Sequence, residues 1–542
     1  MKNKYYPYYH DVDIFTLRDF INYCTEKHST KTAYSYEVKK ELIKKTFVDF
    51  SNDIKTFGAY IADKYPSKSK IAVLGENSYE WIVSYFSATN SGNVIVPLDK
   101  NLPVKDVENI LNETEASLLI CSDTYRDYAE QIQADKIKID IIFVSEIFKS
   151  VFPKVTDKMI AKFENINISP DDLCSIIYTS GTTGMSKGVM LTHKNLCVNL
   201  KGGITSLKAH GKTVLVLPLH HAYGFFANVL FAMFWGVENY INTSLKNMAL
   251  DIQKIKPDVL FAVPMMAETF YNRIWNAINE KKKDKIVPIL IRISNGLLKL
   301  GVDIRRKLFK EVVNGLGGNL SLVVCGGAAL DIKYHQFFES IGVHIAIGYG
   351  ITECSPIISV NLNDLFKYNS AGLPLSCSTI KIENEEGKRE GEILVKGDMV
   401  MKGYYKQPQL TAEVMEGEYF RTGDIGYQDE DGFYFITGRK KNMIVLSNGK
   451  NVYPEELEFE LLKNNAIKEV VVFESDKEIA AEIYPDSQKL ADLSIKDAQK
   501  YFEEYVTEFN KTQPMYKNIN KVVLRDTEFP KTTSMKIKRN YN

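Results

Sequence analysis

The sequence has no excess of charge of either sign, no paired cysteines and no apolar run long enough to cross a membrane. Its 542 residues include 68 Lys and Arg and 68 Asp and Glu, so the net charge is zero and no global field attracts nucleic acid or an anionic membrane. The seven cysteines are odd in number, and no two have C-x-x-C spacing. This argues against a disulfide framework or a zinc ribbon and fits a reducing compartment.

Signals for membrane targeting are also missing. The first residues include lysines but no apolar core segment and no small-residue cleavage site, so we expect no secretory signal. The best membrane candidate, residues 213–237, is interrupted by Pro218, His220 and His221, which leaves 16 residues where a span needs about 20. We predict a buried strand followed by a buried helix there, and a cytoplasmic protein with no transmembrane segment. Peripheral membrane contact stays open, and no nucleic acid is expected as a partner.

The composition is that of an ordinary globular protein, with 45% apolar and 25% charged residues. Over about the first 370 residues, continuously apolar strand-like runs alternate with helical stretches. Such alternation is typical of α/β folds with mostly parallel, layered sheets buried on both faces. The expected strands are 70–74, 94–97, 117–121, 139–144, 214–217, 259–263 and 320–324, and the expected helices include 80–91 and 303–314.

The pattern changes after Gly372. Short strands separated by glycine turns, at 379–382, 391–395 and 433–436, suggest a barrel-like subdomain over about residues 372–437. The polar segment 438–442 then precedes about 100 residues of α+β pattern. We therefore expect a large N-terminal domain, 1–438, and a small C-terminal domain, 439–542. The lysines at 281–283 and 285 predict a solvated turn, with an interaction patch as the alternative.

The strongest chemical signal is the segment Tyr178–Gly188, which follows a mostly apolar strand. Three glycines and five Ser or Thr residues surround the single Lys187. Glycines let backbone N–H groups approach an anion, hydroxyls donate to phosphate oxygens, and the lysine adds a mobile positive charge. The segment therefore predicts a phosphate-holding loop, with a flexible turn as the alternative. It is not a Walker A loop, because Ser186-Lys187-Gly188 stands where Gly-Lys-Ser/Thr is required.

This loop resembles the signature of the adenylate-forming (AMP-binding) superfamily, which includes acyl-CoA synthetases, peptide-synthetase adenylation domains and beetle luciferases. Further segments resemble motifs of that family, in the family's order, across nearly the whole chain. They are Gly75–Trp81, Pro97–Asp99, Pro218–Gly224, Gly326–Leu330, Gly348–Glu353, Tyr419–Asp424, Gly438–Lys441 and Pro530–Ile537.

The resemblance implies roles for individual residues. Tyr349 would stack on adenine, Thr352 would contact the α-phosphate, and Glu353 would bind Mg²⁺, a hard cation that prefers oxygen ligands. Asp424 would accept both ribose hydroxyls, with Arg439 as a second ribose or phosphate contact. Taken alone, without the neighbouring motif residues, Glu353 would indicate a surface or capping carboxylate and Arg439 a surface ion pair. The other implied ATP or AMP contacts are Thr179, Ser180, Gly181, Thr182, Thr183, Gly184, Lys187, Gly327, Ala328, Gly348 and Gly350.

The resemblance also implies a mobile C-terminal domain. Lys441 resembles the hinge residue, and Lys536 resembles the catalytic lysine that stabilises the adenylation transition state. Two departures stand beside them: Met535 replaces the family's usual glycine, and Asn442 replaces a frequent aspartate. Neither removes a charged catalytic group.

Two histidines and two cysteines need separate consideration. In the family, the residue matching His221 lies beside the entering carboxylate; a metal site with His220 is the alternative, but no third ligand stands at a zinc-like spacing. Cys325 and Cys354 adjoin ligand motifs, and we expect both to be small buried residues rather than nucleophiles. The apolar residues after His221 are expected in the core or in the wall of an acyl tunnel: Phe225, Phe226, Leu230, Phe231, Phe234 and Trp235.

The style of segments 217–221, 308–330 and 446–456 resembles long-chain fatty acyl-CoA synthetases. The implied activity is a two-step ligase reaction of a medium- or long-chain fatty acid, ATP with Mg²⁺, and coenzyme A, through acyl-AMP. The missing amine-holding aspartate argues against an amino acid substrate. An acyl-carrier-protein ligase, another stand-alone acid-adenylating enzyme and a non-catalytic binder of ATP or acyl-adenylate are the alternatives.

Overall fold

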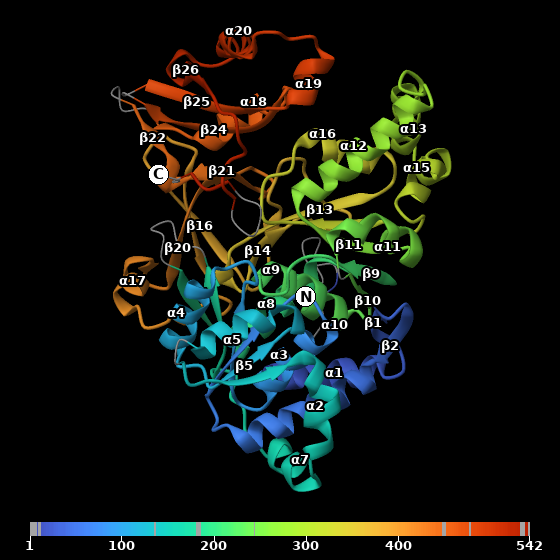
Figure 1. Cartoon of the computed structure of the whole chain (residues 1–542). Helices are drawn as coiled ribbons and strands as arrows, with labels where there is room; N and C mark the ends of the chain where they lie inside the picture. The colour runs from blue at the N-terminus through green and yellow to red at the C-terminus, as the bar shows by residue number, and fades with distance from the viewer. Residues whose placement is uncertain are drawn as a thin grey trace. The chain divides into compact units, whose positions relative to one another are not determined.

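The computed structural model describes residues 8, 12–134, 137–179, 186–242, 244–446, 451–475, 478–531 and 537–539 (Figure 1). The chain forms two compact units. Unit 1 comprises Met1–Thr379 and Val395–Phe420, and unit 2 comprises Ile380–Leu394 and Arg421–Asn542. The segment expected to be barrel-like, 372–437, is therefore divided between the two units.

A seven-stranded sheet organises the first half of unit 1. Its order is β18-β8-β7-β4-β3-β5-β6, with the strands β3 to β7 parallel and β8 and β18 antiparallel to their neighbours. The strands are β3 (Lys70–Leu74), β4 (Val94–Leu98), β5 (Leu118–Cys121), β6 (Asp140–Phe143), β7 (Leu173–Thr179), β8 (Lys187–Thr192) and β18 (Gly403–Tyr404).

Both faces of this sheet are covered, as continuously apolar strands require. Ala72 and Leu74 pack with Val107 and Ile110 of α4, while the alternate residue Val73 is also fully buried. The principal helices are α1 (Leu17–His28), α2 (Phe47–Lys64), α3 (Tyr79–Asn90), α4 (Val104–Thr114), α5 (Arg126–Ala134), α7 (Asp157–Glu164) and α8 (His193–Ser206).

Threonines define where several of these helices begin. Thr16, Thr46 and Thr192 each accept a hydrogen bond from the backbone of the residue three positions later, whose side chain bonds back to the threonine N–H. Such capping boxes satisfy backbone donors that a helix N-terminus leaves free. They fix α1, α2 and α8 at their first residues.

Two further sheets complete unit 1. One has the order β2-β1-β10-β9, and the other has the order β11-β12-β13-β14-β15, in which the first three strands are parallel. The strands are β1 (Thr32–Val38), β2 (Glu41–Thr46), β9 (Lys212–Leu215), β10 (Glu238–Ile241), β11 (Val259–Ala262), β12 (Leu322–Cys325), β13 (His344–Gly350), β14 (Ile357–Val360) and β15 (Leu373–Pro374).

The stretch after β9 is a buried helix, as its apolar sequence predicts. It runs through α9 (Ala222–Phe225), the π-helical η4 (Phe226–Phe231) and α10 (Ala232–Phe234). Among the described helices, none is both long and apolar enough to cross a membrane.

The helical region around residue 300 differs from its prediction. The single helix expected over 303–314 is two short helices, α14 (Arg305–Leu308) and α15 (Lys310–Gly315), because Phe309 leaves the helical conformation, with φ −100° and ψ 28°. The Phe309 side chain is buried, so its packing overrides the local helical pattern. The other helices of this part are α11 (Met248–Ile255), α12 (Pro264–Glu280), α13 (Ile286–Lys299) and α16 (Ile332–Ser340).

Unit 2 contains a sheet in which β21 runs antiparallel to β20, and an α+β layer. In the first, β16, β17 and β20 are neighbours and β21 pairs with β20; in the second, β24, β25 and β26 pair in that order. The α18 and α20 helices bury Leu457 and Phe502 against the second sheet. The elements are β16 (Thr379–Asn384), β17 (Gly391–Lys396), β20 (Tyr419–Gln428), β21 (Tyr434–Arg439), β22 (Ile444–Val445), β23 (Asn451–Val452), α18 (Pro454–Leu461), β24 (Ile467–Ser475), β25 (Glu478–Pro485), α19 (Ser487–Asp492), α20 (Ala498–Asn510) and β26 (Ile519–Leu524).

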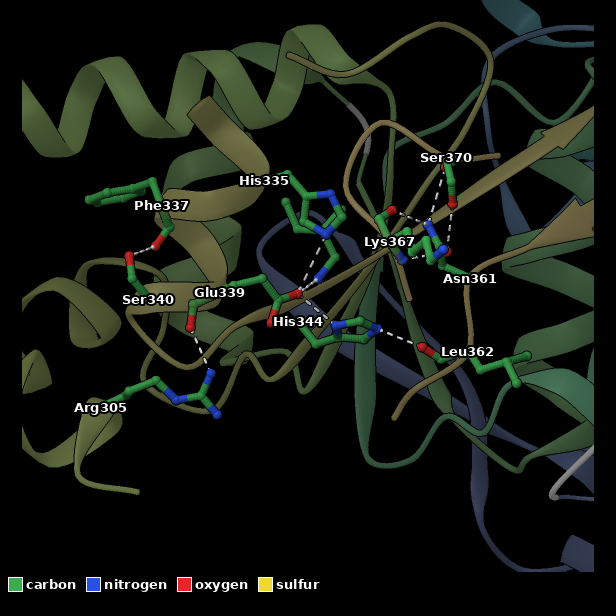
Figure 2. Close-up of polar contacts among 11 residues, drawn as sticks. Arg305, His335, Phe337, Glu339, Ser340, His344, Asn361, Leu362, Lys367 and Ser370 are labelled. Atoms are coloured by element: carbon green, nitrogen blue, oxygen red, sulfur yellow. Dashed lines mark hydrogen bonds and ion pairs between the residues drawn. The ribbon is translucent and has the colours of Figure 1, made fainter. Parts of the chain in front are cut away.

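A buried ion-pair network fixes the start of β13 in unit 1 (Figure 2). The Nδ1 of His344 lies 2.6 Å from Glu339 Oε1, and its Nε2 lies 3.0 Å from the carbonyl oxygen of Leu362. Both ring nitrogens of His344 therefore lie within hydrogen-bond distance of an oxygen atom. His335 Nε2 lies 3.6 Å from the same Oε1, and the Ile345 N–H donates to it at 2.9 Å. Glu339 therefore joins α16 to β13, and His344 joins β13 to the loop after β14.

The charge state of Glu339 follows from these contacts. Burial raises the pKa of its carboxyl, but the nearby His335 and the hydrogen bonds with His344 and the Ile345 N–H outweigh this and hold the pKa at about 2. Because the folded-state pKa lies below the unfolded value of about 4.3, the carboxylate stabilises the fold above that value. The stabilisation is lost as the pH falls from about 5 to about 2.

We expect Glu339→Gln to lower the free energy of unfolding at neutral pH by roughly 1–3 kcal/mol, because the contacts of the carboxylate with His344 and the Ile345 N–H are lost or weakened. The difference from the parent should shrink as the pH falls toward 2, where the parent carboxyl is also neutral. Urea unfolding of the full-length parent and variant at several pH values measures this difference in unfolding free energy. Glu311→Gln, at an exposed ion pair with Lys281, is the matched control. A difference that stays constant with pH would contradict the account.

Candidate active site

The two ends of the predicted phosphate loop meet at the mouth of the β7–β8 hairpin. Thr179, the last residue of β7, pairs with Lys187, the first residue of β8. Of the residues between them, Ser180, Gly181, Thr182, Thr183, Gly184 and Met185 lie outside the described part of the chain. The hairpin therefore positions Lys187 at the base of a loop that begins and ends at adjacent strand positions.

Tyr404 brings Lys187 and Glu353 together. The Tyr404 hydroxyl donates to Glu353 Oε1 at 2.8 Å, and Lys187 Nζ lies 5.3 Å from the centroid of the Tyr404 ring. Strand β18 places Tyr404 opposite Val189 of β8, and the Met401 N–H donates to the Glu353 carbonyl oxygen at 2.8 Å. Burial, with the Glu353 charge and hydrogen bond, raises the pKa of Tyr404, so the phenol remains a donor.

The sequence motifs did not identify Tyr404 as a site residue. It stands 51 positions from Glu353, and its strand β18 consists of Gly403 and Tyr404 alone, neither of them charged. Nothing in its local pattern distinguishes it from a core tyrosine.

The Gly348–Glu353 motif forms the end of β13 and the turn that follows. Tyr349 pairs with Ser359 of β14, and Thr352 and Glu353 lie half-buried in the short 3₁₀ helix η6 (Thr352–Cys354). A Cβ at Gly350 would lie 2.0 Å from the Pro356 carbonyl oxygen, so only glycine fits there. The backbone at Gly350 therefore packs closely against Pro356, directly before β14, and Glu353 lies in the turn between them.

The Gly326–Leu330 motif follows the neighbouring strand β12. Gly327 has φ +90°, a left-handed conformation that favours glycine, and both Gly327 and Ala328 are exposed. Parallel strands β12 and β13 thus end in two exposed glycine turns side by side, the usual place for a ligand in an α/β sheet.

An apolar pocket lies at these strand ends. It holds about 620 Å³ of empty space, part of it open to solvent. Glycines of the two motifs form part of its wall together with aliphatic and aromatic side chains from α8, η4 and β11 to β14. The lining residues are Gly203, Leu207, Tyr223, Phe226, Ala227, Phe231, Phe261, Val324, Cys325, Gly326, Gly327, Gly348, Gly350, Pro356, Ile357 and Val360.

Two of the six apolar residues expected in a tunnel wall or core line this pocket, namely Phe226 and Phe231. The others are not among its lining residues; Phe225, for example, stacks on Tyr85 with the ring centroids 3.9 Å apart. Two residues of the run therefore line an apolar pocket, while Phe225, Leu230 and Phe234 are buried outside its lining. The use of this pocket as an acyl tunnel stays a prediction.

The histidine pair is held by residues of the two N-terminal motifs. His220 Nε2 lies 3.4 Å from Asp99 Oδ1, and the His220 and His221 rings contact each other with centroids 4.3 Å apart. Asn77 donates to the Leu217 carbonyl at 2.9 Å and accepts from the Leu219 N–H at 3.1 Å. The fold therefore supplies the third potential metal ligand, Asp99, that sequence spacing did not show; one ligand atom from each of the three residues lies within 4.8 Å of the others.

The cysteines beside the motifs are buried, as predicted. Cys354 has no exposed surface and Cys325 has almost none. Burial raises the pKa of the Cys325 thiol to about 12. A thiol in that state is a poor nucleophile at neutral pH.

In unit 2, the residues expected at the ribose form an ion pair. Asp424 of β20 and Arg439 of β21 are paired in register, and Arg439 Nε lies 2.6 Å from Asp424 Oδ1. The Asp424 side chain is buried while that of Arg439 is 41% exposed. Lys441 is exposed in the 3₁₀ turn that follows, and the amide of Asn442 donates to Glu455.

The expected catalytic loop has only its ends described. Lys531 and Ile537 form an antiparallel bridge, and Lys531 is paired with Glu469 and with Glu528, the latter at 3.0 Å. Lys536 and Met535 lie outside the described residues. The bridge shows that the loop starts and ends at one anchored position on unit 2.

Comparison with known proteins agrees with these motifs. Residues 22–405 match the family described as AMP-binding enzyme, and residues 441–541 match the AMP-binding enzyme C-terminal domain.

Three individual relatives illustrate the similarity. The chain is 28% identical to a long-chain-fatty-acid–CoA ligase of Mycobacterium bovis over 74% of this chain and 70% of the relative. It is 27% identical to a chloroplastic long-chain-fatty-acid–[acyl-carrier-protein] ligase of Arabidopsis thaliana, over 82% and 72% respectively. The solved o-succinylbenzoate CoA synthetase of Bacillus subtilis, in complex with its acyl-adenylate, has the same fold, with a TM-score of 0.75, 21% identity and 96% coverage of both chains.

The α/β fold class, with its mixed sheets and a separate C-terminal domain, is therefore confirmed. The family profile spans well over half of the chain, and the motifs at the ends of β7, β12 and β13 lie within it. The chain belongs to the family of AMP-binding, adenylate-forming enzymes.

Proposed function

We propose that the protein activates a carboxylic acid, a medium- or long-chain fatty acid, and transfers it to coenzyme A. In the first step a carboxylate oxygen bonds to the α-phosphorus of ATP and pyrophosphate leaves. In the second step the thiol of coenzyme A attacks the acyl carbon, loses its proton, and AMP leaves. The observation that carries the proposal is the apolar pocket at the ends of β11 to β13, which adjoins the glycine turns of the nucleotide motifs.

The pocket supports a fatty acyl chain as its occupant. Its wall has aliphatic, aromatic and glycine residues and no charged side chain. Each buried CH₂ contributes about 0.8 kcal/mol, or roughly fourfold in affinity, so preference should rise with chain length until the pocket is full.

Residues of unit 1 account for the phosphates and the cation. Thr179 to Gly184 and Lys187 hold the polyphosphate, Thr352 contacts the α-phosphate, and Tyr349 stacks on adenine with Gly327, Ala328, Gly348 and Gly350 around it. Glu353 suits Mg²⁺, because the Tyr404 hydrogen bond orients its carboxylate while a hard cation takes oxygen ligands. Bound Mg²⁺ neutralises charge on the transferring phosphate. His221 stands beside the entering carboxylate, with its segment fixed by Asn77.

Residues of unit 2 complete the proposal. Asp424 accepts the ribose hydroxyls, since a buried carboxylate offers two acceptor oxygens and Arg439 already fixes its orientation. Lys536 stabilises charge that builds on the α-phosphate during adenylation. Rotation about Lys441 then exchanges this loop for the surface used in thioester formation, and the C-terminal domain, 439–542, moves as a body. A cytoplasmic location is part of the proposal, supported by seven free cysteines.

A carrier protein is the second candidate acceptor. The similarity to an acyl-carrier-protein ligase supports it, and the acid-activating step would be unchanged. Thioester formation with coenzyme A alone, against formation only with a carrier protein, separates the two.

We expect carboxylate-dependent exchange of pyrophosphate into ATP, increasing steeply from acetate to medium and long fatty acids, by roughly fourfold per CH₂ in kcat/KM. Ala227→Phe, which fills the pocket wall, should shift the preference to shorter acids while activity with short acids remains as a control on folding. A flat chain-length profile, or a best substrate with an α-amino group, would contradict the fatty acid assignment. A folded protein without exchange on any acid would contradict catalysis.

Lys536→Ala should lower the rate of pyrophosphate release from ATP and acid by roughly 10²–10³, since a preorganised charge at the transition state is lost. The same variant, given pre-made acyl-AMP and coenzyme A, should form thioester at near the parent rate. Lys538→Ala, at an exposed lysine beyond the same loop, is the matched control. Equal loss in both half-reactions would indicate a folding or hinge defect, and no loss in either would mean that the loop is unused.

Tyr404→Phe should lower the exchange rate by roughly tenfold or more and raise the Mg²⁺ concentration needed for half-maximal rate. The reason is that Glu353 loses the hydrogen bond that orients it. A hydrogen bond to a charged group contributes roughly 1.5–3 kcal/mol. Tyr405→Phe, the adjacent residue, should behave as the parent. A normal Mg²⁺ dependence in Tyr404→Phe would show that the hydrogen bond is only structural.

A further inference from the structure

The helix α13 (Ile286–Lys299) presents an apolar face to solvent. Its buried residues are Val287 and Ser294, whereas Ile286, Ile289 and Ile293 are each more than half exposed. These three isoleucines are spaced i, i+3 and i+7 and therefore share one face of the helix, about a quarter-turn or more away from the buried face. Leu300, directly after the helix, is 78% exposed and continues the same row.

A row of basic residues borders this face. Lys285, Arg292 and Lys299 are spaced by seven positions, which places them in one line along the helix beside the isoleucines. All three are exposed, and in the described part of the chain no ion pair joins them to an acidic side chain. The sequence of α13 contains no Asp or Glu. The predicted solvated turn before it, at Lys281 to Lys283, is also exposed, with Lys281 and Lys283 sharing Glu311 at 3.3 and 3.5 Å.

The fold leaves this face uncovered. Helix α13 contacts α14 and α16, its buried residues Val287 and Ser294 lie away from the isoleucine row, and in Figure 1 it lies at the margin of the helices that follow β11. Because an amphipathic helix normally turns its apolar stripe to the core, an outward stripe with a basic border indicates a binding surface.

We propose that this face of α13, formed by Ile286, Ile289, Ile293 and Leu300 with Lys285, Arg292 and Lys299, docks on an anionic lipid bilayer. The helix would lie in the plane of the interface, with the aliphatic side chains among the acyl chains and the basic side chains at lipid phosphates. The charge complementarity is local, since the chain as a whole has no net charge.

The composition of the face favours lipid over a protein partner. Its exposed apolar residues are aliphatic, with no aromatic side chain to anchor a protein interface, whose cores are enriched in Tyr, Trp, Phe and Met. The inference does not depend on the catalytic proposal, because it concerns a surface outside the pocket lining. If both hold, the enzyme would meet its acid where fatty acids partition.

Co-sedimentation of the full-length protein with vesicles tests the proposal without any substrate. We expect binding to phosphatidylcholine vesicles that contain phosphatidylglycerol, weaker binding to phosphatidylcholine alone, and loss of the difference when salt is raised to about 0.5 M. Lys285→Gln/Arg292→Gln/Lys299→Gln should lower the partition coefficient on anionic vesicles by roughly a hundredfold, about fivefold for each basic residue.

The apolar row needs its own variant. Ile289→Gln/Ile293→Gln should lower binding to both kinds of vesicle, while pyrophosphate exchange with a water-soluble short acid stays at the parent rate. The matched controls are Lys149→Gln/Lys154→Gln/Lys158→Gln and Leu42→Gln/Leu493→Gln, at exposed positions elsewhere, which should bind like the parent.

Three results would overturn the proposal. One is no binding to anionic vesicles at low salt. Another is vesicle binding that neither α13 variant reduces. The third is a concentration-dependent dimer, or a complex with an acidic carrier protein, that the α13 variants abolish while vesicle binding is unchanged. That result would assign the α13 face to a second copy of the chain or to the carrier protein.

Discussion

The geometry of the candidate site depends on the hydrogen bond from Tyr404 to Glu353. It ties the turn after β13 to β18, and β18 is paired with the hairpin that carries the phosphate loop. Lys187 contacts the same tyrosine ring, and within the described residues no ion pair joins it to Glu353. The neutral Tyr404 side chain therefore contacts both the Lys187 ammonium and the Glu353 carboxylate, which, as the structure describes them, form no ion pair with each other. In the proposed reaction, the two charges would remain available for the polyphosphate and its metal ion.

The glycine turns and the apolar pocket near this polar centre differ in what they offer a ligand. The turns after β12 and β13 carry glycines where the proposed nucleotide would approach the backbone, and the pocket beside them is mostly apolar. Binding of a remote, unreactive chain can offset the cost of ordering the reacting carboxylate. The parallel strands bring both functions to one edge of one sheet, although the residues come from segments more than a hundred positions apart.

Local pattern predicted those parts of the structure that local sequence determines. The strand at Lys70–Leu74 has the bounds that its apolar run indicates, and the motif residues Thr352 and Glu353 lie on the expected turn. Prediction from local pattern was wrong or incomplete where contacts with residues distant in the sequence determine the structure. Phe309 breaks a helical repeat because its side chain is buried, and Phe225 belongs to the core because Tyr85 stacks on it. Tyr404 and Asp99 act through partners far along the chain, so neither could be assigned from its neighbours. The roles of Lys536 and Asp424 came from resemblance alone and stay predictions.

The buried thiol of Cys325 has a consequence for chemical selectivity. An acyl-adenylate is a mixed anhydride, and any thiolate beside it would capture the acyl group as a thioester on the protein itself. Cys325 lines the pocket, yet burial raises the pKa of its thiol to about 12, so the reactive thiolate is scarce at neutral pH. If the pocket takes the acyl group as proposed, a buried, protonated sulfur in its wall would disfavour acylation of the enzyme itself and leave the activated acid to the external acceptor.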